Sequence, residues 1–245
     1  METRRIFVDK LKMKNGMVVV TGPYQKYIVT VLRKDVGDRV DLIDGKGYLY
    51  RCVVSGIKGK ELYLQVVDVV HHPEEKRAKV TLFVSPIKGP RMDWLVEKAT
   101  ELGVDRIVPT LFKRTVIKMD NGHMVKPERW RKICIEASRQ CGRFSVPEVT
   151  EPIPLRGILS YMDRFKHRWL LYEKERKQTI RDVMNPQVKG EICVAVGPEG
   201  GFEEGEVAWL EEQNFMPLTL GENILRTETT PLVVLSIIFY ELNMR

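Results

Sequence analysis

The stretch Ile192-Cys193-Val194-Ala195-Val196-Gly197-Pro198-Glu199-Gly200-Gly201-Phe202 decides how this chain folds. Its first five residues form a continuous apolar run rich in β-branched side chains, which is typical of a strand buried in a parallel sheet. Three glycines and a proline follow within five positions, and glycine lets a backbone approach a ligand closely. Three glutamates in residues 203–206 then favour the start of a helix. This strand, glycine loop and helix predict the edge of an open α/β sheet where ligands bind.

The glycine loop matches no common phosphate-binding motif. It lacks the Lys-Ser/Thr pair of a P-loop and the G-x-G-x-x-G spacing of a dinucleotide site. Glu199 in its middle would also repel a pyrophosphate. On these residues alone, a plain tight turn that needs glycine for steric reasons explains the loop equally well.

A second glycine turn follows the predicted strand Met216–Leu220, in the stretch Leu220-Gly221-Glu222-Asn223-Ile224-Leu225-Arg226-Thr227-Glu228-Thr229-Thr230. Both turns flank apolar residues. Arg226 follows two apolar residues, and a charge in such surroundings is costly unless it is paired or used. A salt bridge with Glu228 or Glu199 would explain it structurally. Arginine stays protonated and is no base, but it can stabilise negative charge that develops on a substrate oxygen.

The two halves of the chain differ in pattern. Residues 1–72 contain several short strand-like runs separated by hairpin signals such as Asp44-Gly45-Lys46-Gly47, which predict a small β-barrel. Residues 73–245 alternate strands with amphipathic helices, which predicts a parallel sheet with helices on both faces. Residues 231–240 are apolar on nearly all sides, so we expect a helix buried in the core or in a subunit interface.

Composition limits the classes of function. The 245 residues carry a formal net charge of +7. Residues 1–72 contain 13 Lys/Arg against 8 Asp/Glu, residues 73–195 contain 25 against 16, and residues 196–245 contain 2 against 9. The basic residues 1–195 favour binding of a polyanionic partner, whereas the acidic residues 196–245 do not. The four cysteines show no metal-binding spacing, and no apolar stretch is long enough for a bilayer; we expect a cytoplasmic protein without a metal.

Several motifs in order along the chain resemble the ribosomal RNA small subunit methyltransferase E family, which belongs to the SPOUT class. They are Gly197–Phe202, the run Leu220–Thr230, Lys88–Gly103 with Lys88-Gly89-Pro90-Arg91-Met92-Asp93, Glu136–Gln140 with Arg143 and Pro147, and Arg4–Val8. The resemblance implies an N-terminal PUA-like RNA-binding β-barrel over 1–72 and a SPOUT methyltransferase domain with a trefoil knot over 73–245. It also implies a homodimer and methyl transfer from S-adenosylmethionine to N3 of a uridine in 16S rRNA of the small ribosomal subunit.

The resemblance and the residue chemistry together name the expected site. Arg226 and Glu199 are the expected catalytic residues, Glu199 as a group that orients or deprotonates the base. Arginine forks and helix N-termini suit phosphate groups. The expected RNA-binding residues are Arg4, Arg5, Lys88, Arg91, Arg114, Arg139, Gln140 and Arg143. The expected cofactor-binding residues are Leu171, Gly197, Glu199, Gly200, Gly201, Leu220, Gly221, Ile224, Leu225, Arg226 and Thr227.

Two alternatives stay open. The family usually has a basic residue where this chain has Asn223, so a non-catalytic RNA-binding or ribosome-assembly factor with the same fold is possible. The other alternative is a methyltransferase that acts on another RNA, such as tRNA. For the basic side chains themselves, a solvated surface is the structural alternative.

Overall fold

The computed structural model describes residues 5–8, 11, 13–71, 78–117, 127–184, 188 and 190–243. It divides the chain into two compact units, the first of Met1–Glu75 with Ser138–Val146 and the second of Lys76–Ala137 with Pro147–Arg245. The sequence pattern places residues 138–146 in the second domain, whereas the structure groups them with the first. The expected boundary near residue 72 and the expected RNA-binding residue Arg4 lie outside the described residues.

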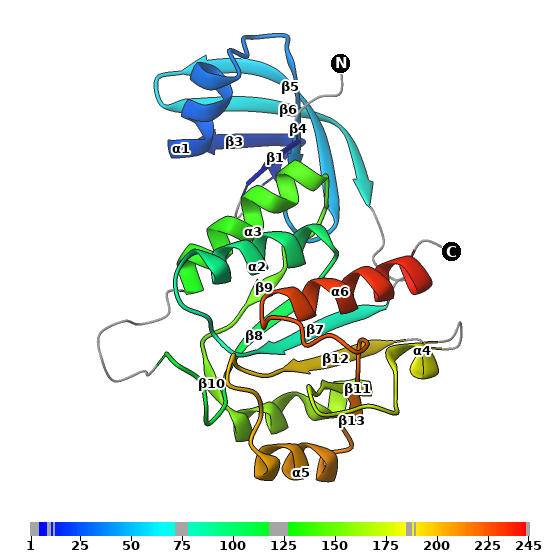
Figure 1. Cartoon of the computed structure of the whole chain (residues 1–245). Coiled ribbons are helices and arrows are strands. Elements are labelled where there is room, and N and C mark those ends of the chain that lie inside the picture. Colours follow the sequence, from blue (N-terminus) through cyan, green and yellow to red (C-terminus); the bar gives the residue numbers. More distant parts are fainter. Residues whose placement is uncertain are drawn as a thin grey trace. The chain divides into compact units, whose positions relative to one another are not determined.

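The first unit is built on a six-stranded sheet in the order β1-β4-β5-β6-β3-β2 (Figure 1). The pairing of β1 with β4 is parallel and the others are antiparallel. In β3, alternate residues point to the core: Val18 and Val20 are buried and Val19 is exposed. The elements are β1 (Arg5–Phe7), β2 (Met13–Lys14), β3 (Met17–Thr21), α1 (Gly22–Lys26), the π-helix η1 (Tyr27–Val31), β4 (Arg39–Ile43), β5 (Tyr48–Lys58) and β6 (Glu61–His71).

The second unit contains a parallel sheet in the order β10-β8-β7-β12-β11-β13, with β9 beside β8. The prediction of a parallel sheet is therefore confirmed. The elements are β7 (Lys79–Val84), α2 (Pro90–Glu101), β8 (Arg106–Leu111), α3 (Pro127–Cys141), β9 (Glu148–Val149), β10 (Ile153–Pro154), the 3₁₀ helix η3 (Leu155–Arg164), β11 (Phe165–Leu171), α4 (Ile180–Val183), β12 (Glu191–Val196), α5 (Glu204–Glu212), β13 (Met216–Leu218), α6 (Thr229–Ile238) and the π-helix η4 (Phe239–Asn243).

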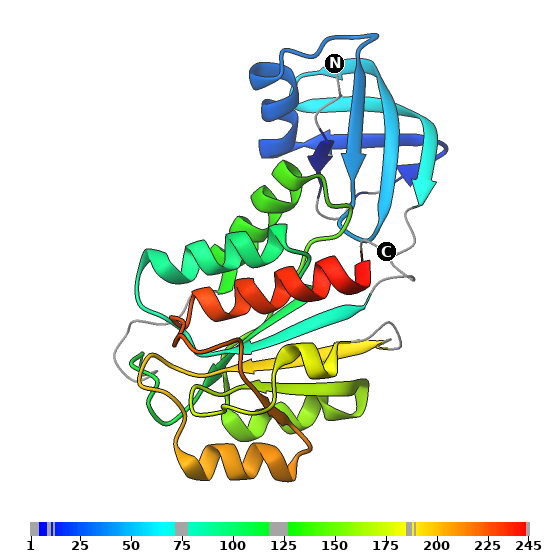
Figure 2. The ribbon, with the colours of Figure 1, turned by 45° about the vertical axis from the view of Figure 1, so that its right-hand side comes forward.

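Helices cover both faces of this parallel sheet. Figures 1 and 2 show α2 and α6 on one face and η3 and α5 on the other. Strand β12 is buried along almost its whole length: Cys193 and Ala195 join the core under η3 and α5, and the alternate residues face the other side. Burial on both faces explains why residues 192–196 are apolar without alternation.

Helix α6 is only partly enclosed within the chain. It contacts α2 and β12, and it buries Pro231, Val234, Leu235 and Ile238. Ser236 lies on the exposed side, and beyond the helix Phe239 and Tyr240 are exposed too, Tyr240 by 63%. The apolar run therefore serves the core on one side and leaves apolar surface on the other.

Candidate active site

Three turns meet at the carboxyl ends of three neighbouring strands in the second unit. In the sheet β11 lies between β12 and β13, so the chain after Leu171 lies between the turn after Val196 and the turn after Leu218. Parallel α/β sheets bind ligands at this edge. The prediction that the turn after β12 borders a ligand site agrees with this position.

A cavity of about 520 Å³ opens between these turns. Its volume falls in the range of about 300–1,000 Å³ that is typical of small-molecule sites. Every expected cofactor-binding residue lines it except Gly200. The complete lining is Arg91, Leu171, Tyr172, Glu173, Arg176, Val196, Gly197, Pro198, Glu199, Gly201, Leu218, Thr219, Leu220, Gly221, Glu222, Asn223, Ile224, Leu225, Arg226, Thr227 and Thr230.

Two glycines of the first turn are required by their surroundings. A Cβ at Gly197 would lie 2.7 Å from the ring of Phe202, which is buried behind the turn. Gly201 has φ +72°, and its amide donates a hydrogen bond to the carbonyl of Pro198 at 2.9 Å. A Cβ at Gly201 would overlap the carboxylate of Glu173, a pocket residue. The turn therefore brings backbone to the pocket where any larger residue would displace a neighbour.

Gly200 faces another part of the same unit. Its carbonyl accepts a hydrogen bond from Arg114 Nη1 at 2.9 Å, and a Cβ there would meet the Arg114 side chain at an ordinary 3.4 Å. Arg114 also lies 3.8 Å from Glu203. Gly200 thus does not line the cavity, and Arg114 supports the turn from outside.

Backbone and hydroxyl groups fix the second turn. Thr219 Oγ1 hydrogen-bonds the amide and the carbonyl of Gly221, and Thr219 N donates to the Gln178 carbonyl at 2.8 Å. Thr229 N and Thr230 N both donate to the Arg226 carbonyl, which starts α6. Asn223 is exposed and lines the pocket, so the position that departs from the family pattern belongs to this site.

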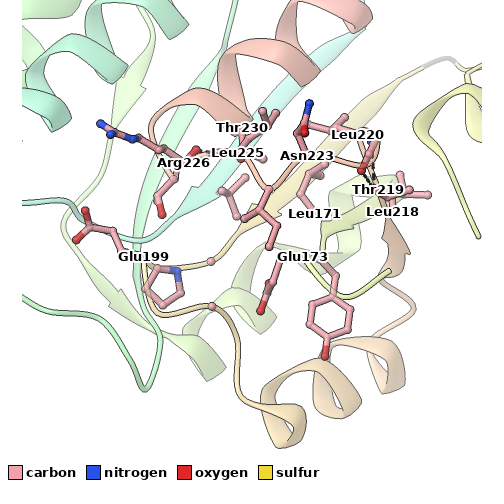
Figure 3. Close-up of a pocket in the computed structure, with 18 of the residues that line it drawn as sticks. Leu171, Glu173, Glu199, Leu218, Thr219, Leu220, Asn223, Leu225, Arg226 and Thr230 are labelled. Carbon is pink, nitrogen blue, oxygen red and sulfur yellow. Dashed lines mark hydrogen bonds between the residues drawn. The ribbon is translucent and has the colours of Figure 1, made fainter. Parts of the chain in front are cut away.

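On one side of the pocket, Arg91, Glu199 and Arg226 are linked by ion pairs that also include Glu228. Figure 3 shows Arg226 and Glu199 on that side, away from Thr219 and Leu220. Arg91 Nη1 donates a very short hydrogen bond to Glu199 and lies 3.7 Å from Glu228 Oε1. The Glu199 hydrogen bond raises the pKa of Arg91 above its usual value. Arg226 Nη1 is 4.0 Å from Glu228 Oε1, and its side chain is 80% exposed.

The structure distributes the expected RNA-binding residues between the two units. Lys88, Arg91 and Arg114 lie in the second unit, where Lys88 is exposed two residues before α2 and Arg91 lines the pocket. Arg5, Arg139, Gln140 and Arg143 lie in the first unit.

Within the first unit the arginines bind the barrel and the segment 138–146 to each other. Arg5 Nη1 donates to the Gly142 carbonyl at 2.6 Å, and its guanidinium lies 4.6 Å from the Phe144 ring centre. Arg139 Nη2 donates to the Phe7 carbonyl at 3.3 Å. Arg5 and Arg139 therefore have a structural role in this unit in addition to their charge.

Pocket residues after β11 were not expected, apart from Leu171. Tyr172, Glu173 and Arg176 line the pocket, and Arg176 Nη1 donates to the Glu173 carbonyl at 2.7 Å. The signal available in the sequence was a polar run, residues 172–178, directly after an apolar strand; unlike the turn after β12, this run contains no glycine.

Two kinds of feature are absent from the described part of the chain. Among those residues, no group of three or more His, Cys, Asp or Glu side chains is placed to hold a metal ion. No helix within them is both long and apolar enough to cross a bilayer.

Comparison with known proteins extends over nearly the whole chain. Residues 73–239 match the RNA methyltransferase domain, and residues 20–67 match the RNA methyltransferase PUA domain. Ribosomal RNA small subunit methyltransferase E of Bacillus subtilis is 32% identical over 91% of this chain and 89% of its own length. The enzyme of the same name from Mesomycoplasma hyopneumoniae is 28% identical over 95% of this chain and 97% of its own. A crystal structure of the Neisseria gonorrhoeae enzyme bound to S-adenosyl methionine superposes with a TM-score of 0.81, 28% identity and 98% coverage of both chains.

The fold, the pocket and these matches define an RNA methyltransferase with an N-terminal PUA domain. Within this class, the chain belongs to the ribosomal RNA small subunit methyltransferase E family. The resemblance recognised from the sequence motifs is thereby confirmed.

Proposed function

We propose that this protein transfers a methyl group from S-adenosylmethionine to N3 of a uridine in 16S rRNA of the small ribosomal subunit. The observation that carries this proposal is the pocket between the turns that follow β11, β12 and β13, in a chain of this family. Relatives of the same family are named for small-subunit rRNA methylation, and one has been crystallised with the cofactor.

The pocket residues fit this cofactor. Apolar side chains such as Leu171, Val196 and Leu218 offer surface for an adenine, and the turn backbones offer donors and acceptors for its polar edge. When bound, S-adenosylmethionine would supply an electrophilic methyl group. We propose that it is held by Leu171, Gly197, Glu199, Gly201, Leu220, Gly221, Ile224, Leu225, Arg226 and Thr227. Gly200, in the same turn, faces Arg114 and not the cavity.

Arg226 is our proposed electrostatic catalyst. When the N3 proton leaves, negative charge develops on uracil O2 and O4. Methyl transfer would then form the N3–C bond as the methyl–sulfur bond of the cofactor breaks, leaving a neutral 3-methyluridine and the cofactor's thioether. An exposed guanidinium at the pocket can approach one of these oxygens, and two of its N–H donors in one plane can meet that oxygen together. Glu199 is our proposed group for orienting the base or accepting the N3 proton. Since Glu199 is hydrogen-bonded to Arg91, Arg91 would set its position.

The proposed RNA contacts lie in both units. Residues 1–72 would form the RNA-binding part and residues 73–245 the catalytic part. Their basic residues would pair with phosphates and release counterions. The proposed contacts are Arg4, Arg5, Lys88, Arg91, Arg114, Arg139, Gln140 and Arg143.

We also propose three properties that follow from the family. The catalytic domain carries a trefoil knot, the protein is a homodimer, and it acts in the cytoplasm, where ribosomal subunits are assembled. Exposed Phe239 and Tyr240 beyond α6 support an apolar contact with a second copy.

The deciding experiment measures methyl incorporation into small subunits from a strain that lacks the modification. Labelled S-adenosylmethionine should label 16S rRNA, and mass spectrometry of its nucleosides should show 3-methyluridine. Label in tRNA alone would instead support the other RNA substrate. Binding to small subunits with no incorporation, and no cofactor binding by calorimetry at millimolar ligand, would support the assembly-factor alternative.

A further inference from the structure

Glu228 is a buried carboxylate, and its second oxygen has no hydrogen-bond partner in the described part of the chain. The residue is 6% exposed, and Oε2 lacks any hydrogen bond among the described residues. Its other oxygen, Oε1, lies 3.7 Å from Arg91 Nη1 and 4.0 Å from Arg226 Nη1. Burying a carboxylate is costly, and buried polar atoms normally have partners. Hydrogen bonding that holds the fold together therefore does not account for Glu228.

Glu206 shows what a structural buried carboxylate looks like in the same unit. It is 8% exposed, and both of its oxygens are used. Oε1 accepts from Lys113 N at 2.7 Å, and Oε2 accepts from Glu203 N at 3.0 Å in the capping box of α5. Glu206 satisfies a helix start. Glu228 is the N-cap residue of α6 but makes no side-chain capping hydrogen bond, and its described ion pairs are with two guanidinium groups.

Both guanidinium groups near Glu228 belong to pocket residues. The side chain of Arg91 is 40% exposed and that of Arg226 is 80% exposed, against 8% for Glu228. Arg91 also pairs with Glu199, but among the described residues the only ion pair of Arg226 is with Glu228. The charges alternate along Arg226, Glu228, Arg91 and Glu199, and this line joins the turn after β13 to the turn after β12.

We propose that Glu228 is a positioning residue that holds the Arg226 guanidinium at the pocket, with Arg91 completing the line of alternating charges. The proposal rests on the function proposed above. An exposed arginine loses rotamer entropy when it is ordered. A fixed opposite charge beside it therefore raises the fraction of molecules in which the guanidinium is held at the pocket. Because Oε2 is buried, Glu228 does not touch a substrate in this arrangement, and its effect passes through Arg226.

The test compares Glu228→Gln, Glu228→Asp and two controls. Glu206→Gln is the matched buried carboxylate, and Glu212→Gln is an exposed one at the end of α5. For Glu228→Gln we expect kcat to fall by about tenfold or more with KM for the cofactor little changed, while thermal stability stays close to wild type. Glu228→Asp keeps the charge and should retain more activity. Glu206→Gln should have the opposite effects: its thermal stability should fall, while the kcat of the folded enzyme should stay nearly normal.

A double-mutant cycle measured by unfolding tests the interaction between Arg226 and Glu228 without an activity assay. Arg226→Gln and Glu228→Gln, alone and together, should show a coupling of at least about threefold in the unfolding equilibrium constant. Normal kcat in Glu228→Gln overturns the proposal, and so does the absence of coupling. If wild type fails to methylate small subunits but the coupling is present, the proposed function fails and the anchoring of Arg226 by Glu228 stands. If Glu228→Gln loses stability as Glu206→Gln does, with the same loss of kcat, Glu228 is structural.

Discussion

Replacing Gly201 by alanine should separate the backbone role of the first turn from its role in the pocket. Gly201 has φ +72°, a conformation that costs a non-glycine residue about 1–2 kcal/mol. For a domain of this size, each kcal/mol lowers Tm by about 2–4 °C. We therefore expect Gly201→Ala to unfold about 2–8 °C below wild type.

The same substitution should weaken cofactor binding by a second route. The new Cβ would overlap a carboxylate oxygen of Glu173 and lie 3.0 Å from its Cδ. Glu173 is a flexible pocket residue, so it can move, but it then takes up space in the cavity. If about five cofactor atoms lose their contacts at about 0.3 kcal/mol each, the loss is about 1.5 kcal/mol. That corresponds to a rise in Kd of roughly tenfold.

Two further variants control this experiment. Gly200→Ala introduces a Cβ at an ordinary 3.4 Å from Arg114, so we expect wild-type Tm and Kd. Gly201→Ala combined with Glu173→Ala removes the overlap but keeps the backbone strain. Its Tm should stay low while its Kd returns to that of Glu173→Ala alone. Thermal scans and calorimetry with S-adenosylmethionine are sufficient, and equal Tm and Kd values for Gly201→Ala and Gly200→Ala would refute the reasoning.

Three further results are expected. Arg226→Lys should lower kcat by about 10²–10³ with little change in cofactor Kd, because lysine keeps the charge and loses the two-point geometry of the guanidinium. Arg226→Ala should lower kcat further. Full activity of the lysine variant would contradict the geometric argument. The wild-type protein should sediment as a dimer at micromolar concentration, and Tyr240→Asp should sediment as a monomer. Ile238→Asp should instead fold poorly, since Ile238 is only 1% exposed within one chain. A monomeric wild-type protein would disprove the dimer. A thiol reagent at about pH 8 should label the exposed Cys141 in the native protein. Cys52 should react only after unfolding, because burial raises the pKa of its thiol to about 12 and leaves little thiolate. Peptide mass spectrometry measures both, and labelling of Cys52 in the native protein would contradict the prediction.

The long periodic elements could be predicted from the sequence. Strand β12 has a continuous apolar run, and α2 has apolar residues spaced for one helical face, so both lie where the pattern places them. Shorter pieces carry too few residues to show a period: β1 has three residues, and β9 and β10 have two each. Helix η3 is a 3₁₀ helix, for which a period of 3.6 residues is no guide.

The assignment of residues 138–146 shows another limit of sequence patterns. The helical pattern runs through Ala137 into Arg139 without a break, yet the contacts of Ser138–Val146 belong to the first unit. Those contacts include Arg139 to the Phe7 carbonyl and Arg5 to the Gly142 carbonyl, which join positions more than 130 residues apart. Local spacing holds no information about such partners.

The pocket shows most clearly why part of a site escapes local patterns. Strands β11, β12 and β13 follow one another along the chain, but β11 is the middle strand of the three in the sheet. The two glycine turns that the sequence identifies are therefore separated by the polar turn after β11, which contributes Glu173 and Arg176 to the pocket. Strand order depends on how the connecting segments cross the sheet. The sequence of a strand does not show which position in a parallel sheet that strand will take. This strand order explains why residue 201 is glycine. A side chain there would overlap Glu173, which follows the neighbouring strand β11. A sequence motif can thus mark where backbone must come close, while the fold decides which side chain it comes close to.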